Sequence, residues 1–596
     1  MTEPAADAEG FDPTLLAVLS SRMSAILREM TNTVVRTSRS SVIKTSRDFS
    51  CGIVTYDHRQ ISCESGLPVH LAALSLTTRP ISKFFDDVKE GDAYVNNCSY
   101  TGGTHHADIA LCVPVFCEGE PLFWTVVRAH HADIGAPEPT TYLPYARTIY
   151  EEGLHFPCVR FQEHYEDKPD LIRMCRMQIR VADVWYGDYR AQVGACRTAE
   201  RRLKELVTKY GLATVKAFIE AWIAYGERRM IAAIRALPAG TWSYETRHDP
   251  VPTVADEGVP VRATLTVDPA TAMITVDVRD NMDCVPGGIN QSETCATAGC
   301  LIGVYNNLDP TIPHNEGSAS RVEILLRDGC VVGRPTYPVG TSVATTNVND
   351  RLSTAVSGCF TQMGRPHGRA EAGYSQTSGL AVISGLDPRS DRPEPYINQF
   401  MLGLSGGAGV DGHDGWVTHG APCDGGMLRI DPIETVESMY PVLIEERRLS
   451  SDTLGCGEWD GAPATQGSYR PLDHDVTVNY ASDGDMFASK GALGGSDGAP
   501  AINAKRHSDG TVHTLPSFHE EICGPDEAIC YRSNAGGGYG DPRARNPARV
   551  AATVNRGWLS HEQAQTVYAV ALVRAANGVD FEVDEAATAE LRGQPV

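Results

Sequence analysis

The sequence contains no apolar run near the roughly 18 residues needed to span a bilayer. It is also poor in basic residues, since 52 Lys and Arg stand against 75 Asp and Glu, a formal net charge of −23. Nucleic acids and anionic lipid surfaces repel such a body, so we expect neither nucleic acid nor membrane as a partner. The first residues, MTEPAADAEGFDP, are acidic and lack the apolar core of a secretion signal. We therefore expect a cytoplasmic protein.

Patterns typical of disulfides are also missing. The 17 cysteines are odd in number and scattered, and no two of them form a C-x-x-C pair. In a chain that we expect in the cytoplasm, this predicts reduced thiols that are mostly buried. Apolar residues make up 42% and charged residues 21%, which is ordinary globular usage and excludes global disorder. The 596 residues suffice for about four domains of roughly 150 residues each.

The pattern of apolar residues predicts an α+β fold in which helices and sheets occur in blocks. A proline after Asp12 and apolar residues at helical spacing predict a first helix that runs to about Val34. From Asp48 to Val127, short β-rich runs alternate with Gly, Asn and Asp turns. This alternation predicts sheet and loops.

Two helices are then expected, at about 187–210 and 212–237. The runs ATLTV and MITVDV flank the turn DPAT and predict a hairpin, and beyond about residue 280 we expect short strands and few long helices. Ser560 and Gln563 resemble a capping box that opens a helix through AQTVYAVALV. The blocks give four regions: the N-terminal helix with a β-rich region (1–180), a helical block (181–240), a β-rich region (241–545) and a C-terminal helical segment (546–596).

One pentapeptide, His-His-Ala-Asp-Ile, occurs twice, at 105–109 and 130–134. Between the copies lie two apolar β-rich runs, 109–116 and 122–127, joined by CEGEP. The repeat holds four of the 18 histidines of the chain, so it concentrates imidazoles and carboxylates at the ends of two neighbouring runs.

If the two runs pair as a hairpin that turns near Gly119, residues whose numbers sum to about 238 face each other. Asp108 and His130 meet this condition at the open end of the hairpin, where facing Cβ atoms lie about 5 Å apart. His105 would lie a few residues further along the same rim. The hairpin therefore predicts that these three side chains meet.

Neutral imidazole and carboxylate together suit Zn, Mn or Fe(II), and an open coordination position would let the ion activate water or polarise a carbonyl. Histidines that cap strand ends and bond to loops are the plainer alternative, and the doubled motif favours the metal site, with His105, Asp108 and His130 as ligands. A fourth ligand must come from elsewhere. Asp48, at a predicted strand start, is the best candidate, and a salt bridge to Arg47 or another base is its alternative.

The other motifs indicate a function less strongly. The glycine-rich segment 536–542 (GGGYGDP) could approach a ligand, and a tight turn ended by proline is the commoner structure. No P-loop pattern is present. The G-x-G-x-x-G at 407–412 and the G-x-S-x-G patterns around Ser405 and Ser496 are not followed by a helical pattern, which a phosphate cradle or a nucleophile elbow requires.

Several segments together resemble the hydantoinase B/5-oxoprolinase family, which includes homologous subunits of acetone and acetophenone carboxylases and of caprolactamase. The resemblance covers about residues 12–575. It rests on TVVRTSRSSVIKTSRDFSC (33–51), the segments around the two pentapeptides, Gly187-Asp188 with Ala191-Gln192, PHNEG (313–317), GGGYGDP and NPARVAATVNRGWLS. His106 departs from the family, which more often has an apolar or aromatic residue there.

The resemblance implies a subunit of a hetero-oligomeric enzyme. A larger hydantoinase A-like partner would bind ATP and Mg and phosphorylate an amide or enol oxygen of a small-molecule substrate. The present chain would carry the metal, and the family's ligands map onto Asp48, His105, Asp108 and His130. His131 and Asp133 fall in the same motif and are expected to orient the ligands or to relay a proton.

Four functions are compatible with these observations. The first is a subunit of an ATP-dependent amidase acting on a hydantoin, 5-oxoproline or lactam, and the second is a subunit of an ATP-dependent ketone carboxylase. The third is a structural partner without chemistry of its own, which predicts no bound metal. The fourth is an enzyme that works as a single chain.

Overall fold

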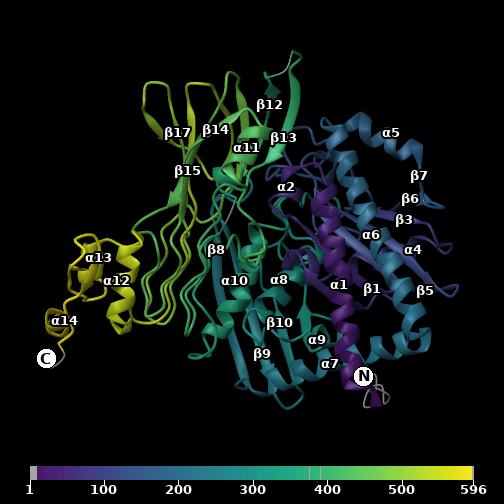
Figure 1. Ribbon diagram of the computed structural model, residues 1–596, viewed down its shortest axis with the longest axis horizontal. Helices are drawn as coiled ribbons and strands as arrows, with labels where there is room; N and C mark the ends of the chain where they lie inside the picture. The colour runs from purple at the N-terminus through teal and green to yellow at the C-terminus, as the bar shows by residue number, and fades with distance from the viewer. Residues whose placement is uncertain (1–9, 375, 390, 594–596) are drawn as a thin grey trace. The chain divides into compact units, whose positions relative to one another are not determined.

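The computed structural model describes residues 10–374, 376–389 and 391–593. The chain divides into two compact units, the first formed by Met1–Trp242 with Arg262–Ser353 and the second by Ser243–Val261 with Thr354–Val596. Both contain helices and mostly antiparallel sheets (Figure 1), which confirms the predicted α+β fold.

The helices before residue 362 are α1 (Pro13–Thr37), α2 (Ser41–Lys44), α3 (Pro68–Leu71), α4 (Ser75–Phe84), α5 (Pro169–Gln178), α6 (Ala182–Tyr210), α7 (Leu212–Arg235), α8 (Glu293–Tyr305), α9 (Glu316–Ala319) and α10 (Val348–Thr361). The strands in this part are β1 (Phe49–Thr55), β2 (Gln60–Ser65), β3 (Ala93–Asn96), β4 (Asp108–Cys117), β5 (Glu120–His130), β6 (Val159–Glu163), β7 (Glu166–Asp167), β8 (Gly240–His248), β9 (Val259–Asp268), β10 (Met273–Asp277) and β11 (Val322–Leu325).

The predicted N-terminal helix is confirmed as α1. The Asp12 carboxylate accepts a hydrogen bond from Thr14 N and caps it, with Pro13 in the first turn. Its buried stripe, which includes Leu19, Met23 and Leu27, packs along α6, and Figure 1 shows the two long helices side by side. The helices α6 and α7 confirm the pair predicted with Gly211 between them.

A seven-stranded sheet of order β2-β1-β5-β4-β3-β6-β7 forms the core of the first unit. Side chains of a strand alternate between faces, so neighbouring residues of β5 serve different partners. Trp124 and Val126 pack with Leu74 and Ile81 on one face. Thr125, between them, donates a hydrogen bond to the carbonyl of Cys196 in α6, which covers the other face.

The clearest differences from the sequence-based expectation concern three helices. The segment 48–127, predicted as sheet and loops, also contains α4, whose inner Pro80 and short length obscure its pattern. Residues 169–178 form α5, which was not predicted. The helix predicted to run from Ser560 through AQTVYAVALV ends at Thr566 as α13, because Ala569 adopts a positive φ of 52° and the chain then enters a strand.

The second unit contains two further sheets, of order β13-β12-β16-β19 and β14-β15-β20-β17-β18, and the β21-β22 hairpin. Its elements after α10 are β12 (Val382–Asp387), β13 (Glu394–Gln399), α11 (Ile433–Met439), β14 (Val442–Leu449), β15 (Thr465–Pro471), β16 (Val476–Ala481), β17 (Ile502–Arg506), β18 (Val512–Thr514), β19 (Phe518–Cys523), β20 (Ala528–Arg532), α12 (Pro547–Asn555), α13 (His561–Thr566), β21 (Leu572–Arg574), β22 (Phe581–Val583) and α14 (Glu585–Leu591). The two larger sheets share a core that includes Phe400, Tyr469 and Tyr531.

The glycine-rich segment at 536–542 packs backbone against backbone. A Cβ on Gly536 would lie 1.8 Å from Gly407 O, and one on Gly537 would lie 2.2 Å from Lys490 O. Only residues without a side chain fit here, so these two glycines are required by close packing rather than by a tight turn.

Two expectations drawn from composition are met within the described residues. The cysteines described there are free thiols and nearly all are buried, with Cys284 and Cys530 partly exposed. None of the helices in this part of the chain is both long and apolar enough to cross a membrane.

Candidate metal centre

The predicted hairpin exists and has the predicted register. The strands β4 and β5 pair antiparallel with Asp108 opposite His130, so the facing residue numbers sum to 238. One irregularity, between Val115 and Phe116, lies near the turn and far from the open end. Because the register places Asp108 and His130 on the same face, their side chains meet at the rim of the sheet.

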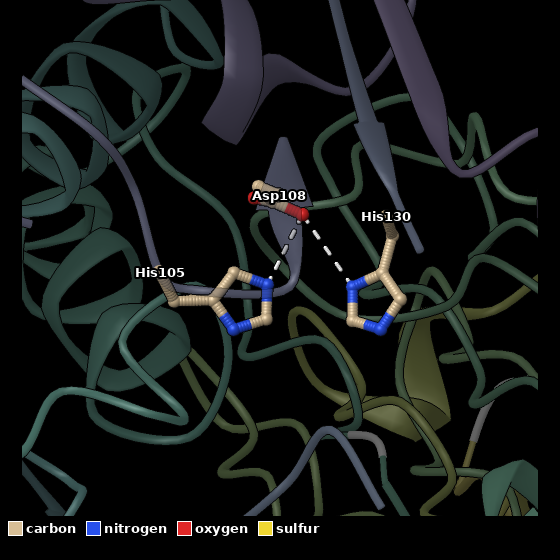
Figure 2. Close-up of side chains that lie close together, drawn as sticks. All are labelled: His105, Asp108 and His130. Atoms are coloured by element: carbon tan, nitrogen blue, oxygen red, sulfur yellow. Dashed lines mark ion pairs between the residues drawn. The ribbon is translucent and has the colours of Figure 1, made fainter. Parts of the chain in front are cut away.

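Three side chains of the two pentapeptides converge at this rim (Figure 2). Asp108 Oδ1 lies 3.1 Å from His105 Nε2 and 3.4 Å from His130 Nδ1. One ligand atom from each residue lies within 4.8 Å of the other two, and all three residues are buried. These are the only His, Cys, Asp or Glu groups in the described part of the chain that meet this criterion for holding a metal ion.

The geometry of the cluster is that of ligands directed at a common point. His105 Nε2 and Asp108 Oδ1 face each other but make no hydrogen bond of normal geometry with any described residue. Buried polar atoms are nearly always paired, so two unpaired atoms at one place require an explanation. A cation between them satisfies both, and the donor set fits a divalent transition metal.

Hydrogen bonds around the cluster set the orientation of both rings. His105 Nδ1 lies 2.7 Å from the carbonyl oxygen of Ser342. A carbonyl only accepts, so Nδ1 carries the proton and Nε2 keeps its lone pair for the cluster. On the other ring, His130 Nε2 bonds the Thr141 hydroxyl at 3.0 Å and Nδ1 faces Asp108. These outer contacts fix the orientation of the two rings, as outer contacts of histidine ligands do in metal sites.

The other carboxylate oxygen of Asp108, Oδ2, also has close polar contacts. Thr104 Oγ1 donates to Asp108 Oδ2 at 2.6 Å, and His70 Nε2 lies 3.0 Å from the same oxygen. His70 comes from α3 and was not predicted as part of the site. It stands outside any repeat or recognisable spacing, so the sequence alone offers no signal for it.

Asp48, the predicted fourth ligand, lies beside the cluster rather than within it. Its carboxylate oxygens are 3.9 Å from His130 Nδ1 and 3.9 Å from His70 Nε2. The residue is buried at the start of the sheet, where the His130 amide donates to its backbone carbonyl. Asp48, directly before β1, therefore borders the proposed ligands, while its role as a ligand stays a prediction.

A buried arginine supports the loop that carries the first pentapeptide. Arg128 Nη1 donates to the carbonyl of His70 at 2.9 Å, and its Nη2 contacts the hydroxyl of Thr77 and the carbonyl of Gly102. Gly102 approaches α4 so closely that a Cβ there would lie 2.0 Å from Leu76 O. The loop before His105 is thus fixed against α4.

At Asp108, His130 and His70 the surroundings favour the protonation states that a metal needs. Burial raises the pKa of Asp108, but the charges of His105 and His70 outweigh it and hold that pKa well below its usual range. Burial lowers the pKa of His130 to about 4 and also lowers the pKa of His70. An ionised carboxylate and neutral imidazoles are the forms that bind metal. At His105, burial lowers the pKa, but the Asp108 carboxylate outweighs it, so that pKa is raised.

The remaining polar residues of the second pentapeptide, His131 and Asp133, have partners outside the cluster. His131 Nε2 bonds Gln192 Oε1 of α6 at 3.0 Å. Asp133 accepts hydrogen bonds from the amides of Gly135 at 2.9 Å and Arg180 at 2.6 Å. Both carboxylate oxygens of Asp133 are therefore engaged in holding the chain after β5.

His106 turns away from its neighbour His105. Its Nδ1 lies 2.6 Å from Glu152 Oε2 and its Nε2 lies 3.1 Å from His155 Nδ1. Glu152 also accepts from Thr341 N, next to the Ser342 that holds His105. His106 thus makes polar contacts outside the cluster.

The comparisons with known proteins agree with the motifs. The profile of the family described as Hydantoinase B/oxoprolinase matches residues 12–542. The chain is 32% identical over 584 residues to the caprolactamase subunit beta of Pseudomonas jessenii, covering 97% of this chain and 98% of that protein. The crystal structure of the ATP-dependent caprolactamase from Pseudomonas jessenii superposes with a TM-score of 0.87 at 30% identity, over 98% of this chain and 100% of that chain.

A nucleotide-free structure of acetone carboxylase has a TM-score of 0.85 at 19% identity, over 99% of this chain and 83% of that chain. An identity this low shows a common fold alone. The profile match and the nearly full-length similarity to the caprolactamase subunit carry the assignment. The chain belongs to the hydantoinase B/oxoprolinase family.

Proposed function

We propose that this chain is the metal-containing subunit of an ATP-dependent, hetero-oligomeric enzyme that hydrolyses a cyclic amide of the hydantoin, 5-oxoproline or lactam type. In this proposal a hydantoinase A-like partner subunit binds ATP and Mg and phosphorylates the amide oxygen. The observation that carries the proposal is the buried cluster of His105, Asp108 and His130 in a chain 32% identical to a caprolactamase subunit.

The chemistry of amides explains why phosphorylation and hydrolysis would be combined in one enzyme. An amide carbonyl is a poor electrophile because of its resonance, and phosphorylation of its oxygen removes that resonance and creates a leaving group. The present chain then has to bind the activated ring and direct water at its carbon. A buried site with fixed polar groups suits this step, because orientation and exclusion of bulk water both lower the barrier.

We propose that His105, Asp108 and His130 hold a Zn, Mn or Fe ion, with Asp48 as the fourth ligand. When bound, such an ion polarises a carbonyl and makes water more acidic. Thr104 and Ser342 keep the ligand atoms of Asp108 and His105 directed into the site. The donor set does not select among the three metals, because all of them accept imidazole and carboxylate.

His131 and Asp133 were predicted to orient the ligands or to relay a proton. The contacts of Asp133 with Gly135 and Arg180 support the orienting role, since they fix the segment after His130. The contact of His131 with Gln192 supports the same role. Proton relay through either residue stays a prediction.

The test is reconstitution with the partner subunit. The chain is co-expressed with a hydantoinase A-like subunit, and the purified complex is incubated with ATP and with hydantoin, 5-oxoproline or caprolactam. We expect ADP and the ring-opened product with at least one substrate, and about 10³-fold less product with His105→Ala. Asp86→Asn, an exposed acidic residue, is the matched control. Full activity of the His105→Ala complex would contradict the proposal.

A ketone carboxylase is the second candidate, favoured by the fold shared with acetone carboxylase. The same reconstituted complex separates the two candidates. A strict requirement for bicarbonate, with formation of a new carbon–carbon bond, would exclude the amidase. The remaining hypotheses predict other results: a structural partner would purify without metal, and a single-chain enzyme would be active without the partner subunit.

A further inference from the structure

The second compact unit contains a cavity of about 210 Å³. Its walls are the last turns of α10, the segments 369–372 and 490–493, and the side chain of Tyr244. The glycine-rich segment supports one wall, because Gly538 O accepts from the amide of Ala492 and Gly537 packs on Lys490 O. The cavity is thus built from segments held by backbone contacts.

Tyr244 and Glu371 form a wall whose polar atoms are already paired. A Cβ on Gly358 would lie 2.3 Å from the Tyr244 ring, so only glycine lets this ring lie on α10. The Tyr244 hydroxyl donates to Glu371 Oε1 at 2.9 Å. Glu371 Oε2 accepts from the Tyr374 hydroxyl at 2.9 Å and from Lys490 N at 3.0 Å. The Glu371 carboxylate therefore accepts hydrogen bonds from three donors, none of which is a cationic side chain.

Two cationic side chains line the cavity without an acidic partner. Arg369 is partly buried, and its backbone is held to the end of α10 through Thr361 Oγ1. Its guanidinium makes no ion pair or hydrogen bond with any residue that the structure describes. Lys490 Nζ lies 6.0 Å from the centre of the Tyr244 ring and likewise has no carboxylate partner among the described residues.

A partly buried guanidinium without a carboxylate partner is unexpected in this chain, where acidic residues outnumber basic ones by 75 to 52. Burial lowers the pKa of Arg369 to about 10, which reflects a guanidinium that has lost water without gaining a carboxylate. The partly buried guanidinium of Arg369 and the exposed ammonium of Lys490 can both make charge-assisted hydrogen bonds with an oxyanion. We propose that this cavity binds a small oxyanion, a phosphate or a carboxylate, through Arg369 and Lys490.

Three features of the surroundings oppose an anion. The nearest is the Glu371 carboxylate in the cavity wall, whose negative charge is offset by its three hydrogen-bond donors. The carbonyl end of α10 lies at the cavity and carries a partial negative charge. Asp497, which accepts from Gly491 N at 2.8 Å, is an acid near this wall. The helix end and Asp497 act at longer range than direct bonds from two cations, and solvent and salt weaken their effect further. The volume admits an anion of a few heavy atoms and is below that of a typical drug-sized site.

Calorimetric titration of the full-length, metal-free protein tests this proposal. Inorganic phosphate and acetate are titrated separately at constant ionic strength. We expect one saturable site per chain, and Lys490→Gln or Arg369→Gln should each weaken binding at least about tenfold. Arg543→Gln removes a positive charge from an exposed position of the same unit and should change binding less than about twofold. The melting temperature of each variant shows whether it is folded.

Each result decides the question. Binding of phosphate but not acetate identifies a phosphate site, and binding of both identifies a general carboxylate and phosphate site. No saturable binding up to about 20 mM overturns the proposal. Equal losses in Lys490→Gln and Arg543→Gln also overturn it, because they would indicate nonspecific charge attraction. The titration is repeated with His105→Ala. Binding lost there but kept in Lys490→Gln would place the anion at the metal cluster instead.

Discussion

His130 and His131 are neighbours in the chain but serve opposite faces of the seven-stranded sheet. His130 Nδ1 lies 3.4 Å from Asp108 Oδ1, whereas His131 Nε2 lies 3.0 Å from Gln192 Oε1 of α6. This division follows from the alternation of side chains along a strand. The second copy of the motif therefore contributes one histidine to the proposed metal centre and one to the packing of α6 against the sheet.

This relationship predicts different effects for two adjacent substitutions. His130→Ala should lower metal affinity at least about 100-fold, because it removes a proposed ligand. His131→Ala should change metal affinity less than about threefold and lower the melting temperature, because it breaks the contact with α6. Metal content after dialysis and thermal unfolding of both variants check this. Equal metal loss in the two variants would show that the division between the faces is wrong.

Gly102, in the loop before His105, has a matched control in Gly119, in the turn between β4 and β5. Gly102 and Gly119 have φ values of 87° and 84°, but only Gly102 has neighbours that an added Cβ would strike. Gly102→Ala should lower the free energy of unfolding by about 2–4 kcal/mol and reduce metal affinity, because the loop must shift from α4.

Gly119→Ala carries the same backbone strain in open space. It should cost only about 1 kcal/mol and leave metal affinity unchanged. Thermal unfolding and metal titration of both variants distinguish the close approach from the strain. Similar metal affinities in the two variants would argue against a role of the loop in positioning His105.

His70 is expected to matter although no motif contains it. His70→Leu leaves Asp108 Oδ2 without the ring that lies 3.0 Å away. Metal affinity should fall about 10- to 100-fold, which is typical for loss of a group that orients a ligand, and less than for His105→Ala. His513→Leu, at an exposed position of β18, is the control. A metal affinity equal to that of the unsubstituted chain would remove His70 from the site.

A buried acid of the second unit predicts a pH dependence of stability. Burial raises the pKa of Asp424 to about 7. The folded state then binds a proton that the unfolded state releases above about pH 4, so this stabilisation is complete below pH 4 and is lost as pH rises through 7. The Asp424→Asn variant has no carboxylate to ionise here and so does not lose this stabilisation. Its free energy of unfolding, relative to that of the unsubstituted chain, should therefore rise by at least about 1 kcal/mol from pH 5 to pH 8.

Melting temperatures of both proteins at pH 5 and pH 8 measure this effect. Asp526→Asn, an exposed acid of the same unit, should shift the melting temperature equally at both pH values. If the difference between Asp424→Asn and the unsubstituted chain does not grow with pH, Asp424 is not the group responsible.

Local patterns accounted for the elements that the sequence predicted well. The first helix has a side-chain cap, a proline and one long apolar stripe, and these signals act over neighbouring residues. The register of the β4–β5 hairpin follows from a short turn and a period of two, so Asp108 could be placed opposite His130. Elements with weak local signals were missed, such as α4 with its inner proline and the early end of α13.

The sequence by itself determined which residues carry the proposed chemistry, because a doubled pentapeptide on one hairpin brings its own side chains together. Only the tertiary structure decided how that cluster is completed. His70 approaches from a helix after a different strand, and Ser342 reaches His105 across 237 positions of the chain. The same holds for the cavity at Arg369 and Lys490. Contacts between distant segments depend on how whole elements pack, and no short-range pattern in a single sequence records that packing.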